Sequence, residues 1–329
     1  MKNRFFISSF VGLLLFIFFP AQIFCENSQI KVSLAPEAGF LSGKIVENVW
    51  YVTSEENETS TILTPTTRMS RLDWQEQNSF YWGFDSNFII NDSFSFLMSF
   101  QNAISDTCGV MEDYDWLNPI TEKWKNDPAD ELTNYSIHIN YLSNYTHIRL
   151  LFGKIFYFGQ KKNISLTPNL GLDVEYISFS GIGGWHTYKE NNWSKIYFGE
   201  NEKVISYSQS YAAPIFSLNS DFNFASFFET CLNLSVSWIK DLDCIDIHHA
   251  KNAYYNDKIE NAWNLGAELK LFFKINSHNK FGVKGGINYI PDAYGFTYNS
   301  KTDTIPDFST LGGTSRLMWN YSFVYVFTF

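Results

Sequence analysis

The last nine residues of the chain alternate between aromatic and smaller side chains. Aromatic residues occupy every second position, at Tyr321, Phe323, Tyr325, Phe327 and Phe329. Successive side chains of a β-strand point to opposite faces, so these aromatic rings share one face. A strand with an unbroken aromatic face that ends at a terminal Phe is typical of the last strand of an outer-membrane β-barrel.

The N-terminus has the organisation of a secretory signal peptide. Lys2 and Arg4 precede an apolar run over residues 5–19, and small or polar residues follow it. The run is too short, and has the wrong flanks, for a lasting transmembrane helix. We therefore expect a cleaved signal peptide over residues 1–25 and a single β-barrel domain over residues 26–329.

The composition fits a barrel with a polar interior. Aromatic residues make up 19% of the chain, yet its mean hydropathy is only -0.17. Strands that alternate apolar-out and polar-in produce this combination. Acidic residues outnumber basic ones by 34 to 24, so nucleic acid is a poor partner and cationic peptides are attracted.

Alternating segments divide the sequence into ten predicted strands, separated by alternately short and long polar breaks. This is the asymmetry between the periplasmic turns and the outer loops of bacterial barrels. We predict an all-β fold, a ten-stranded antiparallel transmembrane β-barrel with long extracellular loops. The strands are expected at residues 29–52, 67–90, 93–108, 134–159, 164–181, 203–222, 229–241, 253–275, 280–297 and 313–329, and the long loops at 53–66, 109–133, 182–202, 242–252 and 298–312.

Two carboxylates open the second long loop. Asp113 and Asp115 are two residues apart, so they share one face if the chain is extended there. Neighbouring carboxylates repel each other, and such a pair tends to share a proton or hold a water. Taken alone, a solvated acidic loop is the commoner explanation of this pattern.

A second polar pair, Asp246 and His248, has the same spacing just after the seventh predicted strand. A carboxylate beside an imidazole orients the ring and favours its protonated form, the usual arrangement around a general base. A surface histidine with an acidic neighbour is one alternative. A metal site that includes His249 is another, but adjacent residues on a strand point apart, and we expect no metal.

Six segments carry these pairs and their context in a fixed order. They are Leu41-Ser42-Gly43-Lys44 followed by Glu47, Ser70-Arg71-Leu72-Asp73-Trp74, Met111-Glu112-Asp113-Tyr114-Asp115-Trp116, Asn134-Tyr135, Ser178-Phe179 with Gly183-Gly184, and Trp238 with Asp246-Ile247-His248. In order and spacing they resemble the omptin family of outer-membrane proteases, over nearly the whole mature chain. No single segment carries the resemblance alone.

The resemblance implies an aspartyl-type endopeptidase in the bacterial outer membrane, with a groove that faces the exterior. Asp113 and Asp115 would lie on one wall and Asp246 and His248 on the other. A water between the walls would attack the peptide carbonyl, with His248 as the general base that Asp246 orients. The implied partners are extracellular peptides or proteins, cationic ones above all, and outer-membrane lipid, without a cofactor.

The resemblance also implies a pocket for a basic residue before the scissile bond. Glu47 matches one acidic residue of that pocket directly. Asp243 is the expected second, but the chain is one residue longer than the family pattern here, so Asp241 competes with it. Buried carboxylates favour Arg or Lys through charge-assisted hydrogen bonds. The acidic residue for the next substrate position has no match near Trp124 and Lys125, which leaves an apolar preference open.

The lipid site of the family has no counterpart in this sequence. Omptins need lipopolysaccharide, which basic residues on the barrel exterior bind. The matching positions are Tyr176, Ser210 and Glu260, none of them basic. Charge-assisted bonds to lipid phosphates are therefore missing, and we expect either another activator or an outer membrane without ordinary lipopolysaccharide.

Two other functions use the same barrel. A non-catalytic surface adhesin is one, since fold does not fix function, but all four catalytic-type residues are retained. A diffusion pore is the other, and it is disfavoured because side chains largely fill a lumen of about this size. Cys108 and Cys244 lie near the two walls, where a bridge would fix the groove width. Unpaired thiols are the expectation, since the walls must admit a peptide.

Overall fold

The computed structural model describes residues 29–329 except 58–59, 123–124, 160, 301–302 and 304. The predicted signal peptide lies outside the described residues. The described chain is almost entirely β-structure, with three short 3-10 turns in the connections. No helix in this part of the chain is long and apolar enough to cross a membrane.

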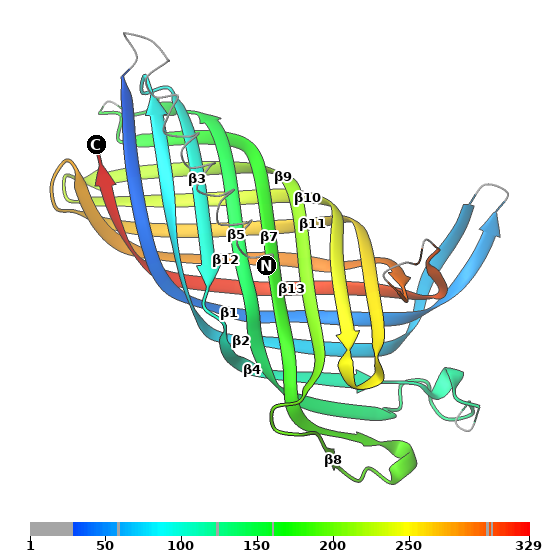
Figure 1. Ribbon diagram of the computed structural model, residues 1–329. Helices are drawn as coiled ribbons and strands as arrows, with labels where there is room; N and C mark the ends of the chain where they lie inside the picture. Colours follow the sequence, from blue (N-terminus) through cyan, green and yellow to red (C-terminus); the bar gives the residue numbers. More distant parts are fainter. Residues whose placement is uncertain (1–28, 58–59, 123–124, 160, 301–302, 304) are drawn as a thin grey trace.

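Long antiparallel strands follow one another along the chain and curve into a barrel (Figure 1). The strands are β1 (Ile30–Asn57), β2 (Ser60–Ile90), β3 (Phe94–Ala103), β4 (Asp106–Asp115), β5 (Asn134–Lys154), β6 (Phe156–Phe158), β7 (Ile164–Tyr188), β8 (Ile196–Tyr197), β9 (Lys203–Ala225), β10 (Phe228–His248), β11 (Ala253–Lys274), β12 (Asn279–Tyr298) and β13 (Asp307–Thr328).

Hydrogen bonds close the strands into a ring. β1 pairs with β2 on one side and with β13 on the other, so the first and last long strands meet. β3 and β4 together fill one place between β2 and β5, while β6 and β8 are short additions beside β7. The ring therefore has ten places, which confirms the predicted ten-stranded antiparallel barrel.

The last strand is oriented as its sequence predicts. Tyr321, Phe323 and Phe327 are exposed on the outer face, whereas Val324 and Val326 between them are buried inside. In Figure 1 the C-terminus and the short turns gather at the upper left, and the long hairpins extend toward the right and the bottom of the view. The two ends of the barrel thus differ as an outer-membrane barrel requires.

The predicted loop boundaries are wrong at the outer end, because the strands continue beyond them. β1 and β2 remain paired as far as Asn57 and Ser60, so residues 53–66 are mostly a hairpin, as their Thr and Ile content favours. β10 continues to His248, so residues 242–248 are strand. The loops expected at 109–133, 182–202 and 298–312 are likewise shortened by β4, β7 and β13. In the opposite direction, the third predicted strand is interrupted at Ile104–Ser105.

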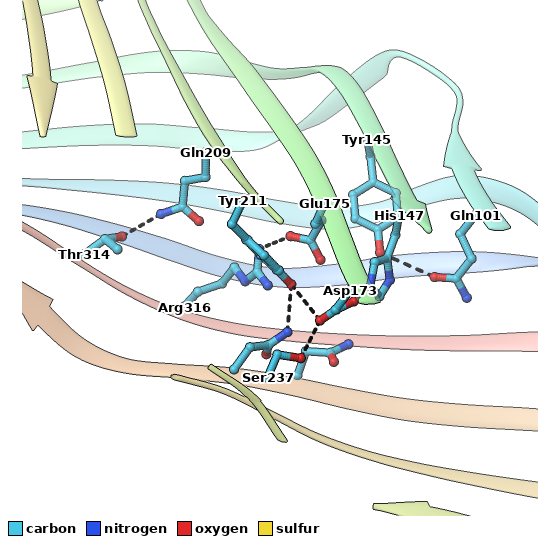
Figure 2. Close-up of polar contacts among 12 residues, drawn as sticks. Gln101, Tyr145, His147, Asp173, Glu175, Gln209, Tyr211, Ser237, Thr314 and Arg316 are labelled. Carbon is cyan, nitrogen blue, oxygen red and sulfur yellow. Dashed lines mark hydrogen bonds and ion pairs between the residues drawn. The ribbon is translucent and has the colours of Figure 1, made fainter. Parts of the chain in front are cut away.

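Charged and polar side chains fill the middle of the lumen (Figure 2). Asp173 is their centre: it accepts hydrogen bonds from Ser237 at 2.6 Å and Tyr211 at 3.3 Å, and pairs with His147 at 2.7 Å and Arg149 at 3.3 Å. Beside it, Arg316 pairs with Glu175 and Gln209 donates to Thr314. The network supplies the partners that buried charges need. Its side chains also occupy the space that an open pore would leave empty.

An apolar layer covers the network on the side of the outer end. Trp74 stacks against Phe179 and Tyr207, with ring centroids 6.0 and 5.7 Å apart. All three rings are fully buried. Tyr207 lies directly opposite Asp246 on the neighbouring strand, so this layer forms the floor of the site described next.

Candidate active site

The candidate catalytic residues lie on the outer side of the part of the barrel that faces lipid. Trp238 and Trp263 lie opposite each other on β10 and β11, and both are exposed on the outer face. Aromatic girdles of this kind mark the membrane interface. Asp246 and His248 lie further along β10 toward the outer end, and are therefore outside the membrane-spanning segments.

A β-bulge in β10 sets which side chains enter the barrel there. The register between β9 and β10 shifts between Ser237 and Asp243, and Lys240 and Asp241 are exposed in succession. Such an extra residue reverses the alternation of faces. Ile239 is buried before the bulge and Leu242 after it. The side chains that face inward therefore belong to odd-numbered residues before the bulge and to even-numbered residues after it.

The bulge corrects one expectation about the basic-residue pocket. Cys244 and Asp246 are buried inside the barrel, whereas Asp241 and Asp243 alternate with them and lie on the outer face. Neither of these two lines a cavity near Glu47. The structure therefore does not bring Asp243, or its competitor Asp241, to the pocket.

Asp246 and His248 form the pair expected of a general base. His248 Nε2 lies 2.7 Å from Asp246 Oδ2, and the His248 ring meets the Tyr255 ring edge-on at 5.6 Å. Burial lowers the pKa of His248, but the charge and hydrogen bond of Asp246 outweigh it and the pKa is raised. With Nε2 donating to the carboxylate, Nδ1 carries the lone pair that can accept a proton.

Asp113 and Asp115 lie on the opposite wall, at the end of β4. They share a cavity of about 310 Å³ with His248. Removal from water and the neighbouring charge of Asp115 raise the pKa of Asp113 to about 8. Asn134 Nδ2 donates to Asp115 Oδ2 at 3.2 Å. The structure thus places all four predicted catalytic residues around one groove, on two separate walls.

A second cavity, of about 420 Å³, adjoins the groove and is acidic. Glu47 from β1 and Asp257 from β11 line it and are almost completely buried. Burial raises the pKa of Asp257 to about 7 although Thr297 donates a 2.7 Å hydrogen bond to it. Burial and the charges of Asp246 and Asp257 raise the pKa of Glu47 well above its ordinary value. We call this the acidic cavity.

Asp257 is a buried carboxylate of the acidic cavity that sequence reasoning missed. It takes the position beside Glu47 that was expected for Asp243. Across the β10–β11 ladder, Asp257 lies opposite Cys244 rather than Asp243, so it faces inward. A lone Asp in a strand of alternating polar residues carries no local signal. Only the register of β10 against β11 reveals that it enters the site.

The 310 Å³ cavity on the other side of His248 has aromatic walls, and we call it the aromatic cavity. Its lining includes His138, His186, Tyr188, Phe198, Val204 and Ile205. His186 lies 4.7 Å from Phe198, ring centre to ring centre. Burial lowers the pKa of both His138 and His186, which favours neutral rings.

His138 forms hydrogen bonds with the Ser136 hydroxyl and the Gly183 carbonyl. Its Nε2 lies 3.0 Å from Ser136 Oγ, and its Nδ1 lies 2.6 Å from the Gly183 carbonyl oxygen. A carbonyl only accepts, so Nδ1 carries the proton and Nε2 accepts from Ser136. Nothing in the sequence pattern singled out this pair.

The remaining predicted positions lie on the barrel wall. Tyr176 and Glu260 are exposed, and Ser210 is half-buried on the same strand face as Asp243. Cys108 on β4 and Cys244 on β10 are buried free thiols.

A closed barrel with an aromatic outer belt and a polar groove at its outer end defines the class of this protein: it is an outer-membrane β-barrel protein. The sequence model of the Omptin family matches residues 28–324, and the chain belongs to this family. It is similar to the plasminogen activator of Yersinia pestis, with 22% identity over 263 residues that cover 79% of this chain and 76% of that protein.

A solved structure shows the same fold. The outer membrane protease OmpT from Escherichia coli superposes with a TM-score of 0.75 at 18% identity, covering 92% of this chain and 99% of that one. The family match and these relatives support a surface protease. The chemistry of its site is developed next as a proposal.

Proposed function

We propose that the protein is an aspartic-type endopeptidase that cleaves extracellular peptides beside basic residues, using a water held between its two polar walls. The observation that carries the proposal is the position of His248. It borders both the acidic cavity and the aromatic cavity, and Asp115 faces it from the opposite wall at the same boundary. A peptide bond placed there is within reach of both walls.

Each wall has its own role in the proposed reaction. His248 Nδ1 accepts the proton of the attacking water, and Asp246 stabilises the imidazolium that forms. Asp113 and Asp115 hold the water, and Asp113, whose pKa is raised to about 8, keeps a proton for the leaving amine at neutral pH. A carboxyl group that holds a proton at neutral pH can act as a general acid.

The two cavities suggest which side chains flank the bond. Glu47 and Asp257 offer a guanidinium or ammonium two buried acceptors, so we assign Arg or Lys to the residue before the scissile bond. The aromatic cavity has no carboxylate beyond the catalytic pair itself. We assign an apolar or aromatic side chain to the residue after the bond.

Cleavage of fluorogenic peptides by refolded protein tests the proposal. Arg-Phe and Arg-Arg peptides would be compared, with His248→Ala in parallel. We expect the parent to cleave both, the Arg-Phe peptide faster, and the variant to cleave neither. Absence of cleavage by a correctly folded parent would refute the protease and favour a non-catalytic adhesin.

We further propose that activity does not require lipopolysaccharide. The outward positions Tyr176, Ser210 and Glu260 offer no cation to a lipid phosphate. The test is to measure cleavage in detergent free of lipopolysaccharide and then after its addition. Comparable rates support the proposal, and activity only after addition contradicts it.

A further inference from the structure

The two cavities meet at four residues. Asp115, Asn134, His248 and Lys251 line both of them, so they mark the boundary between the acidic and the aromatic side. A peptide that places one side chain in each cavity has its scissile bond at this boundary. Three of the four are catalytic residues or their hydrogen-bond partners. Lys251 has no role in the reaction as described so far.

Lys251 is held over the groove by the turn that follows His248. This single 3-10 turn comprises His249–Lys251. The positive charge of Lys251 contributes a lowering of the pKa of Asp113 on β4, His186 on β7 and His248 on β10. Groups on three different strands surround the groove, so a charge that acts on all three lies over the groove and not on the outer wall.

The Lys251 ammonium is available to a ligand. The side chain is exposed, and within the described part of the chain it makes no hydrogen bond or ion pair. It is also the only lysine or arginine among the residues that line the two cavities. The other donor at the boundary, the Asn134 amide, is already bonded to Asp115.

The proposed reaction generates a negative charge at this boundary. The water oxygen bonds to the carbonyl carbon, its proton passes to His248 Nδ1, and the carbon–oxygen π pair moves onto the carbonyl oxygen. When the C–N bond breaks, that pair re-forms the carbonyl and the amine takes up a proton. The carboxyl groups of Asp113, Asp115 and Asp246 surround the site, so an oxyanion there needs a compensating cation.

We propose that Lys251 is a catalytic residue whose ammonium binds the carbonyl oxygen and stabilises it as it becomes an oxyanion. This role rests on the proposed protease function. An interaction that strengthens as charge develops acts mainly on kcat. Removing one oxyanion donor lowers kcat by about 10²–10³-fold in well-studied proteases, and we expect a loss in this range.

The test uses the mature protein with the peptides described above. Lys251→Met removes the charge while keeping the length of the side chain. Lys251→Cys, treated with 2-bromoethylamine, restores an ammonium at nearly the same reach, and equally treated parent controls for the native cysteines. Lys203→Met is the matched control, because Lys203 lies at the start of β9 and lines neither cavity.

We expect Lys251→Met to lose about 100-fold or more in kcat, with KM changed by less than about threefold. Aminoethylation of Lys251→Cys should restore most of the lost kcat. Lys203→Met should have the kcat and KM of the parent. A retained kcat, a loss confined to KM, or no recovery on aminoethylation would overturn the role of Lys251. Folding of each variant is checked by its heat-dependent gel mobility. If the parent itself fails to cleave, the protease proposal falls, which is a distinct result.

Discussion

The acidic cavity predicts a large and separable effect on specificity. Asp257→Asn replaces a buried carboxylate by an amide of the same shape, and the backbone and volume are unchanged. Because Asp257 is only 3% exposed, solvent does not weaken its bond to a cationic side chain. We expect the substitution to reduce selectivity for Arg over an uncharged analogue without abolishing catalysis.

The magnitude follows from the bond that is lost. A hydrogen bond between charged groups contributes about 1.5–3 kcal/mol, and about 1.4 kcal/mol corresponds to a factor of ten. Loss of one of the two carboxylates should therefore lower the selectivity about 10- to 150-fold. Glu47→Gln should act in the same direction, since Glu47 is equally buried.

The assay compares kcat/KM for two peptides that differ only by Arg or citrulline before the scissile bond. Citrulline has the shape of Arg without its charge, so the ratio cancels effects on folding and on the catalytic step. Asp243→Asn is the matched control, because Asp243 is an acidic residue of the adjacent strand that points outward. We expect the ratio to fall for Asp257→Asn and to stay constant for Asp243→Asn. The reverse outcome would refute the assignment of faces made from the β10 bulge.

Three further predictions concern packing, proton transfer and stability. A Cβ at Gly312 would lie 1.9 Å from the Asp257 carboxyl carbon, so Gly312→Ala should displace that carboxylate and lower Arg selectivity in the same assay. Asp246 raises the pKa of His248, and the base acts when neutral, so kcat/KM should rise with pH above the ordinary histidine range. In Asp246→Asn this rise in kcat/KM should move to lower pH. A move to higher pH would contradict the pairing of Asp246 with His248. Asp173→Asn removes the ion-pair partner of the buried Arg149 and should lower the free energy of unfolding by about 3–5 kcal/mol, measured by denaturant titration.

The barrel could be predicted because its signal is local. Outward Tyr321 and Phe323 and inward Ser322 and Val324 alternate with the period that any β-strand imposes, and lipid makes the contrast between faces strong. Beyond the lipid both faces of a strand meet water, and the contrast disappears. This is why the first strand was expected to end at residue 52, before Asn57, and the second to begin only at residue 67, after Ser60.

The site could be predicted only in part, because its two halves depend on different information. Asp113, Asp115, Asp246 and His248 lie at short spacings that a sequence displays directly. The position of Asp257 depends on the register between strands and on a bulge some distance below it. A single extra residue in β10 turns one acidic residue outward while the neighbouring strand supplies another, and no property of either residue reveals this exchange.

The distribution of carboxylates gives a physical reason for the proposed preference for a cationic substrate. Burial and the charges of Asp246 and Asp257 raise the pKa of Glu47, and burial together with the charge of Asp246 raises the pKa of Asp257. Near neutral pH these two carboxyl groups therefore hold protons that the Arg of the proposed substrate would displace. Since the pKa of Asp257 is raised only to about 7, releasing its proton at that pH costs little. An Arg side chain can thus ionise its own pocket, whereas a neutral one leaves the carboxyls protonated and gains no charge-assisted bond.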